Sequence, residues 1–263
     1  MVTILAGSLR AQCPQTNSAF AAGEELNYQL YFNWKFIWIK AGTATLSTQL
    51  TNYDGERAYR CDLLTRGSKR TDKFFVMRDT LSSIVTPELV PLYYHKGALE
   101  GKRHYIDDVW YSYPGNGTVA LRQSYRNSKG VMRQHQATST ECVYDMMSML
   151  LHARSFDVTA FHEGQHITFP MADGDDVKPT TLVYRGRQTC HIAEMGTTYR
   201  CLVFSFVEPE GKKEKEIATF FVTDDLNHIP VRLDLFLTFG TAKAFLRSFS
   251  NLRNPQTSIV EGK

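Results

Sequence analysis

The sequence predicts an all-β protein: one large antiparallel curved sheet, a half-barrel or a sandwich, with one central helix. Apolar and polar residues alternate along many segments, turn residues separate those segments, and a single segment has helical apolar spacing. The chain has 263 residues, of which 43% are hydrophobic, enough for a sizeable core. We therefore expect a single β-rich domain over residues 20–252.

The first predicted strand runs from Leu26 to Trp38, where every even position is apolar. A period of two is typical of a strand with one buried face. Gly42 then opens a second alternating run, and Asp54-Gly55 is expected to form a turn before a third strand from Ala58 to Leu64.

The same pattern continues along the rest of the chain. Before the helix, strands are expected over residues 74–85, 91–95, 103–113 and 118–126. After the helix, strands are expected over residues 165–169, 181–187, 189–193, 199–208, 216–223, 231–239 and 243–252. Many strands joined by short turns favour an antiparallel sheet that curls or closes.

The one predicted helix spans residues 139–154. Its apolar stripe consists of Val143, Met146, Met147, Leu150 and Leu151. Thr138 and Glu141 have the spacing of a capping box at its start. The stripe predicts a helix packed on the core, and a methionine-rich binding surface is the alternative.

The charge balance excludes one class of partner. The chain has 30 basic and 27 acidic side chains and a formal net charge of +3, without the clustered basic face typical of nucleic-acid binding. No segment approaches the ~20 apolar residues of a membrane-spanning helix. We expect no nucleic-acid partner and no transmembrane span.

The N-terminal residues resemble the end of a secretory signal peptide. Val2 to Leu9 form a short apolar run, and Arg10-Ala11-Gln12 follows it. We expect residues 1–11 to be a signal segment and the protein to be exported, to the periplasm or the outer membrane. The alternative is a frayed N-terminal tail.

Two of the five cysteines flank a predicted hairpin turn. If that turn is centred on Met195-Gly196, Cys190 lies directly opposite Cys201, at a separation that a disulfide can bridge. Two buried free thiols are an equally good reading. The remaining cysteines, to which no partner is assigned, are Cys13, Cys61 and Cys142.

The segment from His162 to His166 matches the H-E-x-x-H pattern of zinc hydrolases, in which two histidines one helical turn apart bind the metal. A helix is disfavoured here, because Gly164 lies in the middle and Pro170 follows a run of strand formers. We expect a turn leading into a strand, with no metal and no cofactor. A zinc site at His162 and His166 is the alternative.

Aromatic residues make up 12% of the chain, and many lie on predicted strands among polar residues. Aromatic rings stack on sugars and line lipid clefts. The candidate ligand-binding residues are Trp34, Trp38, Trp110, Tyr111 and Tyr113. No catalytic residue is predicted.

Five blocks of sequence occur in a fixed order. They are Gly23–Tyr28 with Ala41–Ala44, Arg78–Tyr93, Val143–Arg154, Asp224–Val231 and Gly240–Leu246. Together they span about residues 20–252 and resemble an uncharacterised family of exported Gram-negative proteins, a domain of unknown function. The resemblance implies an all-β envelope protein, similar in fold to the capsule-assembly lipoprotein YmcC, and it carries over no catalytic residues.

These observations favour an exported cell-envelope protein that binds or scaffolds a lipid or carbohydrate ligand, rather than an enzyme. Two alternatives stay open. One is a zinc-dependent hydrolase using the His162–His166 segment, and the other is a structural partner in an outer-membrane assembly, recognised by an exposed apolar patch.

Overall fold

The computed structural model describes residues 13–34, 37–73, 75–211, 213–237 and 240–260. Its strands form a single 14-stranded sheet in the order β8-β7-β6-β5-β4-β3-β2-β1-β14-β13-β12-β11-β10-β9, and every neighbouring pair is antiparallel. The predicted fold class is confirmed. The predicted signal segment, residues 1–11, lies outside the described residues.

The strands of the first half are β1 (Glu25–Trp34), β2 (Ile37–Tyr53), β3 (Glu56–Gly67), β4 (Met77–Val85), β5 (Pro91–Glu100), β6 (Arg103–Ser112), β7 (Val119–Asn127) and β8 (Met132–Ser139). The strands of the second half are β9 (His166–Asp173), β10 (Asp176–Ile192), β11 (Thr197–Glu210), β12 (Lys213–Thr223), β13 (Pro230–Leu237) and β14 (Gly240–Ser250). The helices are α1 (Met146–Ala153) and two short 3-10 turns, η1 (Thr71–Lys73) and η2 (Val158–Ala160).

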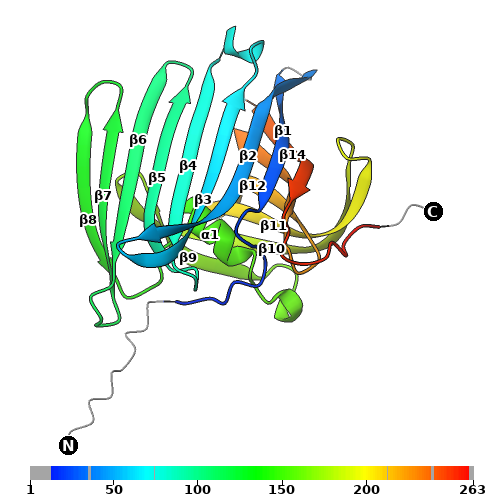
Figure 1. Cartoon of the computed structure of the whole chain (residues 1–263). Helices are drawn as coiled ribbons and strands as arrows, with labels where there is room; N and C mark the ends of the chain where they lie inside the picture. The colour runs from blue at the N-terminus through cyan, green and yellow to red at the C-terminus, as the bar shows by residue number, and fades with distance from the viewer. Residues whose placement is uncertain (1–12, 35–36, 74, 212, 238–239, 261–263) are drawn as a thin grey trace, which may run out of the picture.

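The pairing of β1 with β14 joins the two halves, so the sheet runs without interruption from an edge at β8 to an edge at β9. Figure 1 shows the sheet curving around α1, which lies in the concave interior and contacts β4 and β9. None of the described helices is both long enough and apolar enough to cross a membrane.

The predicted single strand from Leu26 to Trp38 is wrong, because Trp38 belongs to the next strand. β1 ends at Trp34, β2 begins at Ile37, and the two pair antiparallel. Only two residues connect them, so the even positions remain apolar through the reversal and the alternation does not reveal it. Gly42 lies inside β2, where a Cβ atom would approach the Arg66 carbonyl oxygen to 2.1 Å.

The helix begins at Met146 rather than at residue 139. Asp145 is its N-cap and accepts hydrogen bonds from the backbone N–H groups of Met147 (2.9 Å) and Ser148 (2.8 Å). The Ser148 hydroxyl in turn binds the Asp145 N–H, which completes a capping box. The predicted capping box at Thr138 is wrong, because Thr138 belongs to strand β8, where it pairs with Ala120.

The main hydrophobic core fills the concave side and draws residues from both halves of the sheet and from α1. Leu26 and Leu81 contribute from the first half, Tyr199 and Val231 from the second, and Leu151 from the helix. In the predicted apolar stripe Met146 is 47% exposed, because the helix starts only at that residue.

Candidate functional site

A cavity of about 860 Å³ lies where the two free edges of the sheet come together. One wall is formed by β7 and β8, the opposite wall by β9 and β10, and the base by α1 and the chain on either side of it. We call this cavity the seam pocket. Its lining includes Leu121, Thr138, Ser139, Thr140, Glu141, Cys142, Tyr144, Met149, His152, Phe156, Ile167, Thr168, Phe169 and Val177.

Aromatic rings form the deep wall of the seam pocket. The ring of Tyr144 lies 5.8 Å from that of Phe169 and 4.9 Å from the imidazole of His152. The imidazole in turn lies 5.5 Å from the ring of Phe156. Met149, from the same helix as His152, packs in the same cluster. The wall is therefore broad and mainly apolar, with rigid aromatic rings beside the flexible side chain of Met149.

His152 is the titratable group of this wall whose pKa lies below 7. Burial lowers the pKa of His152 to about 4, because desolvation disfavours the charged imidazolium. Nε2 lies 3.2 Å from the Tyr144 hydroxyl. Nδ1 is buried and has no hydrogen-bond partner among the described residues. The ring is therefore neutral near pH 7, and its Nδ1 is a buried polar atom without a partner among the described residues.

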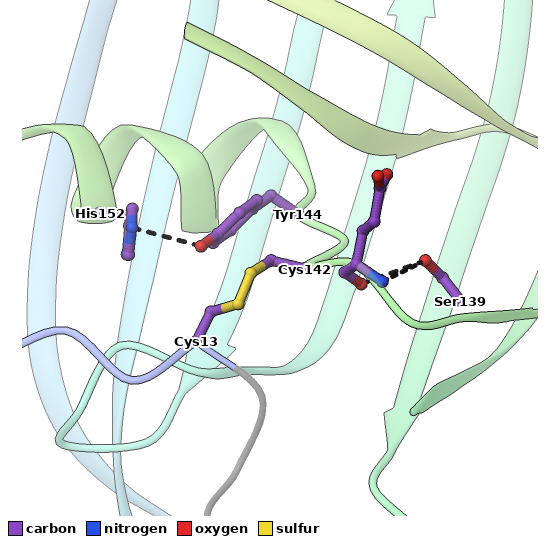
Figure 2. The surroundings of a disulfide bond; sticks show 6 residues. Cys13, Ser139, Cys142, Tyr144 and His152 are labelled. Carbon is purple, nitrogen blue, oxygen red and sulfur yellow. Dashed lines mark hydrogen bonds between the residues drawn. A yellow bond between two sulfur atoms is a disulfide. The ribbon is translucent and has the colours of Figure 1, made fainter. Parts of the chain in front are cut away.

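A disulfide between Cys13 and Cys142 closes one end of the pocket, and their Cα atoms are 5.9 Å apart. Figure 2 shows it beside Tyr144 and His152. The segment after Cys142 also pairs with β9: the Tyr144 N–H donates to the Pro170 carbonyl at 3.1 Å. The bridge thus ties the N-terminal segment to the chain that enters α1. This bridge was not predicted from the sequence, because the two cysteines are 129 residues apart.

The tip of the β9–β10 hairpin contacts β7 and β8 across the seam. The Gln123 side chain, on β7, donates to the carbonyl oxygens of Gly174 (3.2 Å) and Asp176 (2.9 Å). Arg133, on the edge strand β8, forms an ion pair with Asp175 at 2.9 Å. These contacts cross the seam, so the sheet edges are held together without strand pairing.

The mouth of the pocket is polar. The exposed members of the lining include Thr138, Thr140, Glu141 and Thr168. A ligand with an apolar body and a polar end fits this arrangement, since the deep wall removes apolar surface from water while polar residues lie at the exposed mouth.

The five aromatic residues singled out from the sequence do not come together. Trp110 lies on the opposite face of β6 from the buried Tyr111; its ring is covered by the Arg122 guanidinium at 3.7 Å. Tyr111 points inward to the Asp145 carboxylate at 3.4 Å. Tyr113 donates its hydroxyl to the Pro91 carbonyl at 2.8 Å.

The other two predicted aromatic residues lie at the connection between β1 and β2. Trp34 ends β1, and the surroundings of its side chain lie outside what the structure describes. Trp38 is 44% exposed, with the Lys243 ammonium 5.0 Å from its ring. The seam pocket is instead built around Tyr144, Phe156 and Phe169, which sequence analysis did not select.

The His162–His166 segment forms the predicted turn and strand rather than a helix. Gly164 has a φ of 84°, and β9 begins at His166. The His166 imidazole lies 2.8 Å from the Glu214 carboxylate, through Nε2. In the described part of the chain, no three or more His, Cys, Asp or Glu side chains are grouped to share an ion.

Cys190 and Cys201 are both free and buried. The expected register is wrong by two residues: Cys190 lies opposite Tyr199, because the turn is centred between Glu194 and Met195. The two cysteines are therefore diagonal neighbours on one face of the β10–β11 hairpin. Of the two interpretations of the sequence, a disulfide or two buried free thiols, the structure contains the free thiols.

Comparison with solved structures finds related folds at low sequence identity. A β-barrel-like protein of the DUF1849 domain of unknown function, from Brucella abortus, has a TM-score of 0.55 at 12% identity, covering 89% of this chain and 99% of that chain. A protein described as exported, with a YmcC-like fold, from Bacteroides fragilis has a TM-score of 0.34 at 7% identity, covering 90% and 99%. A protein described as a lipoprotein, from Parabacteroides distasonis, has a TM-score of 0.33 at 10% identity, covering 91% and 100%. The first of these likenesses supports the fold.

No curated protein matches the sequence. A family described as "Protein of unknown function (DUF3108)" matches it over residues 27–247, which include the whole sheet except the ends of its first and last strands and confirm the expected uncharacterised β-rich family. Because the match extends over most of the chain, this protein belongs to the DUF3108 family.

Proposed function

We propose that this protein binds an amphiphile with an apolar chain in the seam pocket and acts in the cell envelope as a binding protein rather than an enzyme. The observation that carries the proposal is the cavity of about 860 Å³ with an aromatic wall and a polar mouth. Sites for small ligands are typically concave and apolar, with volumes of about 300–1,000 Å³ and few polar groups.

The polarity of the pocket sets the orientation of the ligand. The apolar chain would lie against Met149, Ile167 and Phe169, which are at least partly buried, and the polar end would lie among the exposed threonines at the mouth. His152 supports binding rather than acid–base chemistry, because a pKa of about 4 makes it a weak base near pH 7 and its polar partner is a tyrosine hydroxyl.

The Cys13–Cys142 disulfide supports an envelope location. Disulfides persist in oxidising compartments such as the bacterial periplasm and are rare where cellular thiols keep cysteines reduced. The bridge joins the chain before β1 to the wall of the pocket. The proposed location is the periplasm or the periplasmic side of the outer membrane, in agreement with the exported family that the sequence resembles.

Binding of a fluorescent long-chain fatty acid, with displacement by unlabelled lysophospholipid, tests the proposal on the purified full chain. Ile167→Trp would fill the pocket from β9 and is expected to weaken binding at least about tenfold, since apolar contacts of the ligand are lost. Leu50→Trp is the matched control, because Leu50 is 46% exposed on β2 and away from the pocket. Equal affinities of both variants, or binding of glycans alone on an array, would contradict the proposal.

A further inference from the structure

One end of the sheet brings together hairpin tips that are distant in sequence. The strand register places Trp38 and Thr241 on either side of Asn33, so the β1–β2 and β13–β14 tips are neighbours. The loop after β3 extends the same end, because the Ser68 N–H donates to the Ala41 carbonyl at 2.8 Å. Figure 1 shows the end of β1, the start of β2 and the chain that follows β3 at the upper end of the molecule.

Large apolar side chains project into solvent at this end. They are Ile37 (66% exposed), Trp38 (44%), Phe75 (48%), Phe236 (39%) and Leu237 (41%). We call the described residues at this end of the sheet, 37–40, 68–73, 75, 100–103 and 236–237, the hairpin rim. Grouped apolar side chains of this kind mark an interaction surface, whereas scattered ones need no explanation.

The hairpin rim is also cationic. Its exposed basic side chains are Lys40, Lys69, Arg70, Lys73, Lys102 and Arg103. The acidic residues of the same connections are engaged locally: Asp72 binds Arg78 at 2.9 Å, and Glu100 accepts from the Tyr105 hydroxyl at 3.1 Å. The positive charge is thus concentrated here, in a chain whose formal net charge is only +3.

We propose that the hairpin rim docks on an anionic lipid surface, with its apolar side chains inserted at the headgroup boundary and its cations against the headgroups. Surfaces that lie in a membrane interface combine Trp, Phe and Leu with Lys and Arg in this way. Protein–protein interfaces differ from such surfaces in composition, because they contain less lysine than the rest of the protein surface. The charge and the side-chain types together therefore favour a lipid surface over a protein partner.

The docking surface is separate from the ligand site. None of the rim residues named above lines the seam pocket. A loss of vesicle binding and a loss of ligand binding are therefore expected from different variants, and neither proposal depends on the other.

Co-sedimentation of the full chain with phosphatidylcholine vesicles, with and without phosphatidylglycerol, tests the proposal. We expect binding to the anionic vesicles only, weakening as salt is raised. Lys69→Gln with Lys73→Gln should weaken the partition coefficient about thirtyfold, because each cation near an anionic surface contributes about a fivefold factor. Ile37→Ser should weaken it about tenfold by removing inserted apolar surface.

Matched controls come from the other end of the sheet. Leu226, in the β12–β13 connection, is 65% exposed, and Arg57, at the start of β3, is exposed too. Leu226→Ser and Arg57→Gln should leave vesicle binding unchanged. Equal binding to neutral vesicles, equal losses in rim and control variants, or no vesicle binding would each overturn the proposal, the last leaving a protein partner for the rim.

Discussion

The guanidinium of Arg154 and the carboxylate of Glu24 form a bidentate ion pair inside the protein. Nη1–Oε1 and Nη2–Oε2 are 2.6 and 2.9 Å, and both side chains are 1% exposed. Arg154 also donates to the Asn227 carbonyl oxygen and lies over the Phe20 ring, 5.6 Å from its centre. The pair joins the end of α1 to the residue before β1, and so ties the helix to the junction between the two halves of the sheet.

Removing either partner should therefore be costly. Arg154→Met or Glu24→Leu is expected to lower the free energy of unfolding by about 3–5 kcal/mol, because each leaves a buried charge uncompensated. The double variant should lose less than either single one, and urea denaturation measures all three. Arg133→Met, at the exposed pair with Asp175, should have little effect. Additive losses in the double variant would show that the two side chains do not act as a pair.

Counting the reactive thiols of the unfolded chain tests the Cys13–Cys142 disulfide directly. The chain has five cysteines, and with Cys13–Cys142 bridged, three thiols should react after unfolding without reductant and five with it. Cys13→Ser with Cys142→Ser is expected to lower the free energy of unfolding by about 2–4 kcal/mol, since the bridge closes a long loop in the unfolded chain. One reactive thiol would instead mean that Cys190 and Cys201 are also joined.

The alternation of apolar residues was enough to predict the sheet, because it reports which face of a strand is buried. It was not enough to place the reversals. The two-residue connection after Trp34 preserves the alternation and merges two strands, and a turn centred one residue earlier than expected displaces Cys201 from Cys190. Local patterns do not encode such registers, which depend on turn geometry.

The candidate site was harder to predict than the fold for a different reason. Its aromatic side chains come from the chain on either side of α1 and from β9, so Tyr144, Phe156 and Phe169 meet only once that segment has packed against β9. The predicted aromatic residues were chosen along single strands, where neighbours such as Trp110 and Tyr111 point to opposite faces. One signal for the site was present in the sequence: Cys13 and Cys142 had no assigned partners, and the disulfide that joins them lies beside the pocket.

The contact of Gln123 with the β9–β10 tip should hold the seam closed. Gln123 is fully buried, and its amide supplies two hydrogen bonds across the seam. Gln123→Met keeps the volume but removes the donor to these two carbonyl oxygens, at a cost of about 2 kcal/mol. Hydrogen exchange should rise around Gly174 and Asp176. The exposed Gln134→Met on β8 is the control, and unchanged exchange in the Gln123 variant would mean that other contacts hold the tip.

Buried carboxylates should make the protein less stable as the pH rises from about 4 to 6. Burial raises the pKa of Asp107 to about 6, with the nearby Lys96 opposing the shift. The folded chain then holds a proton that the unfolded chain has released, so this contribution is complete below pH ~4 and is lost as the pH rises through the folded value. Asp107→Asn should reduce the fall of the free energy of unfolding between pH 4 and 6, whereas Glu56→Gln, at an exposed position, should leave it unchanged. Part of the slope remains in the variant, because burial also raises the pKa of Asp79 and of Asp145 to about 6. An Asp107→Asn variant with the full wild-type slope would contradict the assignment.

His152 should produce the opposite slope over nearly the same range. Its folded pKa of about 4 lies below the usual value because the ring is buried, so its contribution is complete above pH ~6.5 and is lost as the pH falls through 4. His152→Phe keeps the ring contacts with Tyr144 and Phe156 but does not titrate. Between pH 7 and 5, wild type is therefore expected to lose about 2 kcal/mol relative to this variant, as measured by urea denaturation at each pH, while His162→Asn at an exposed position should not differ. Because the ring stays neutral down to pH 5, ligand affinity should not change over that interval.

A His152 proton resonance titrating near pH 6.5 would show instead that the wall of the seam pocket is hydrated and would weaken the case for an apolar ligand.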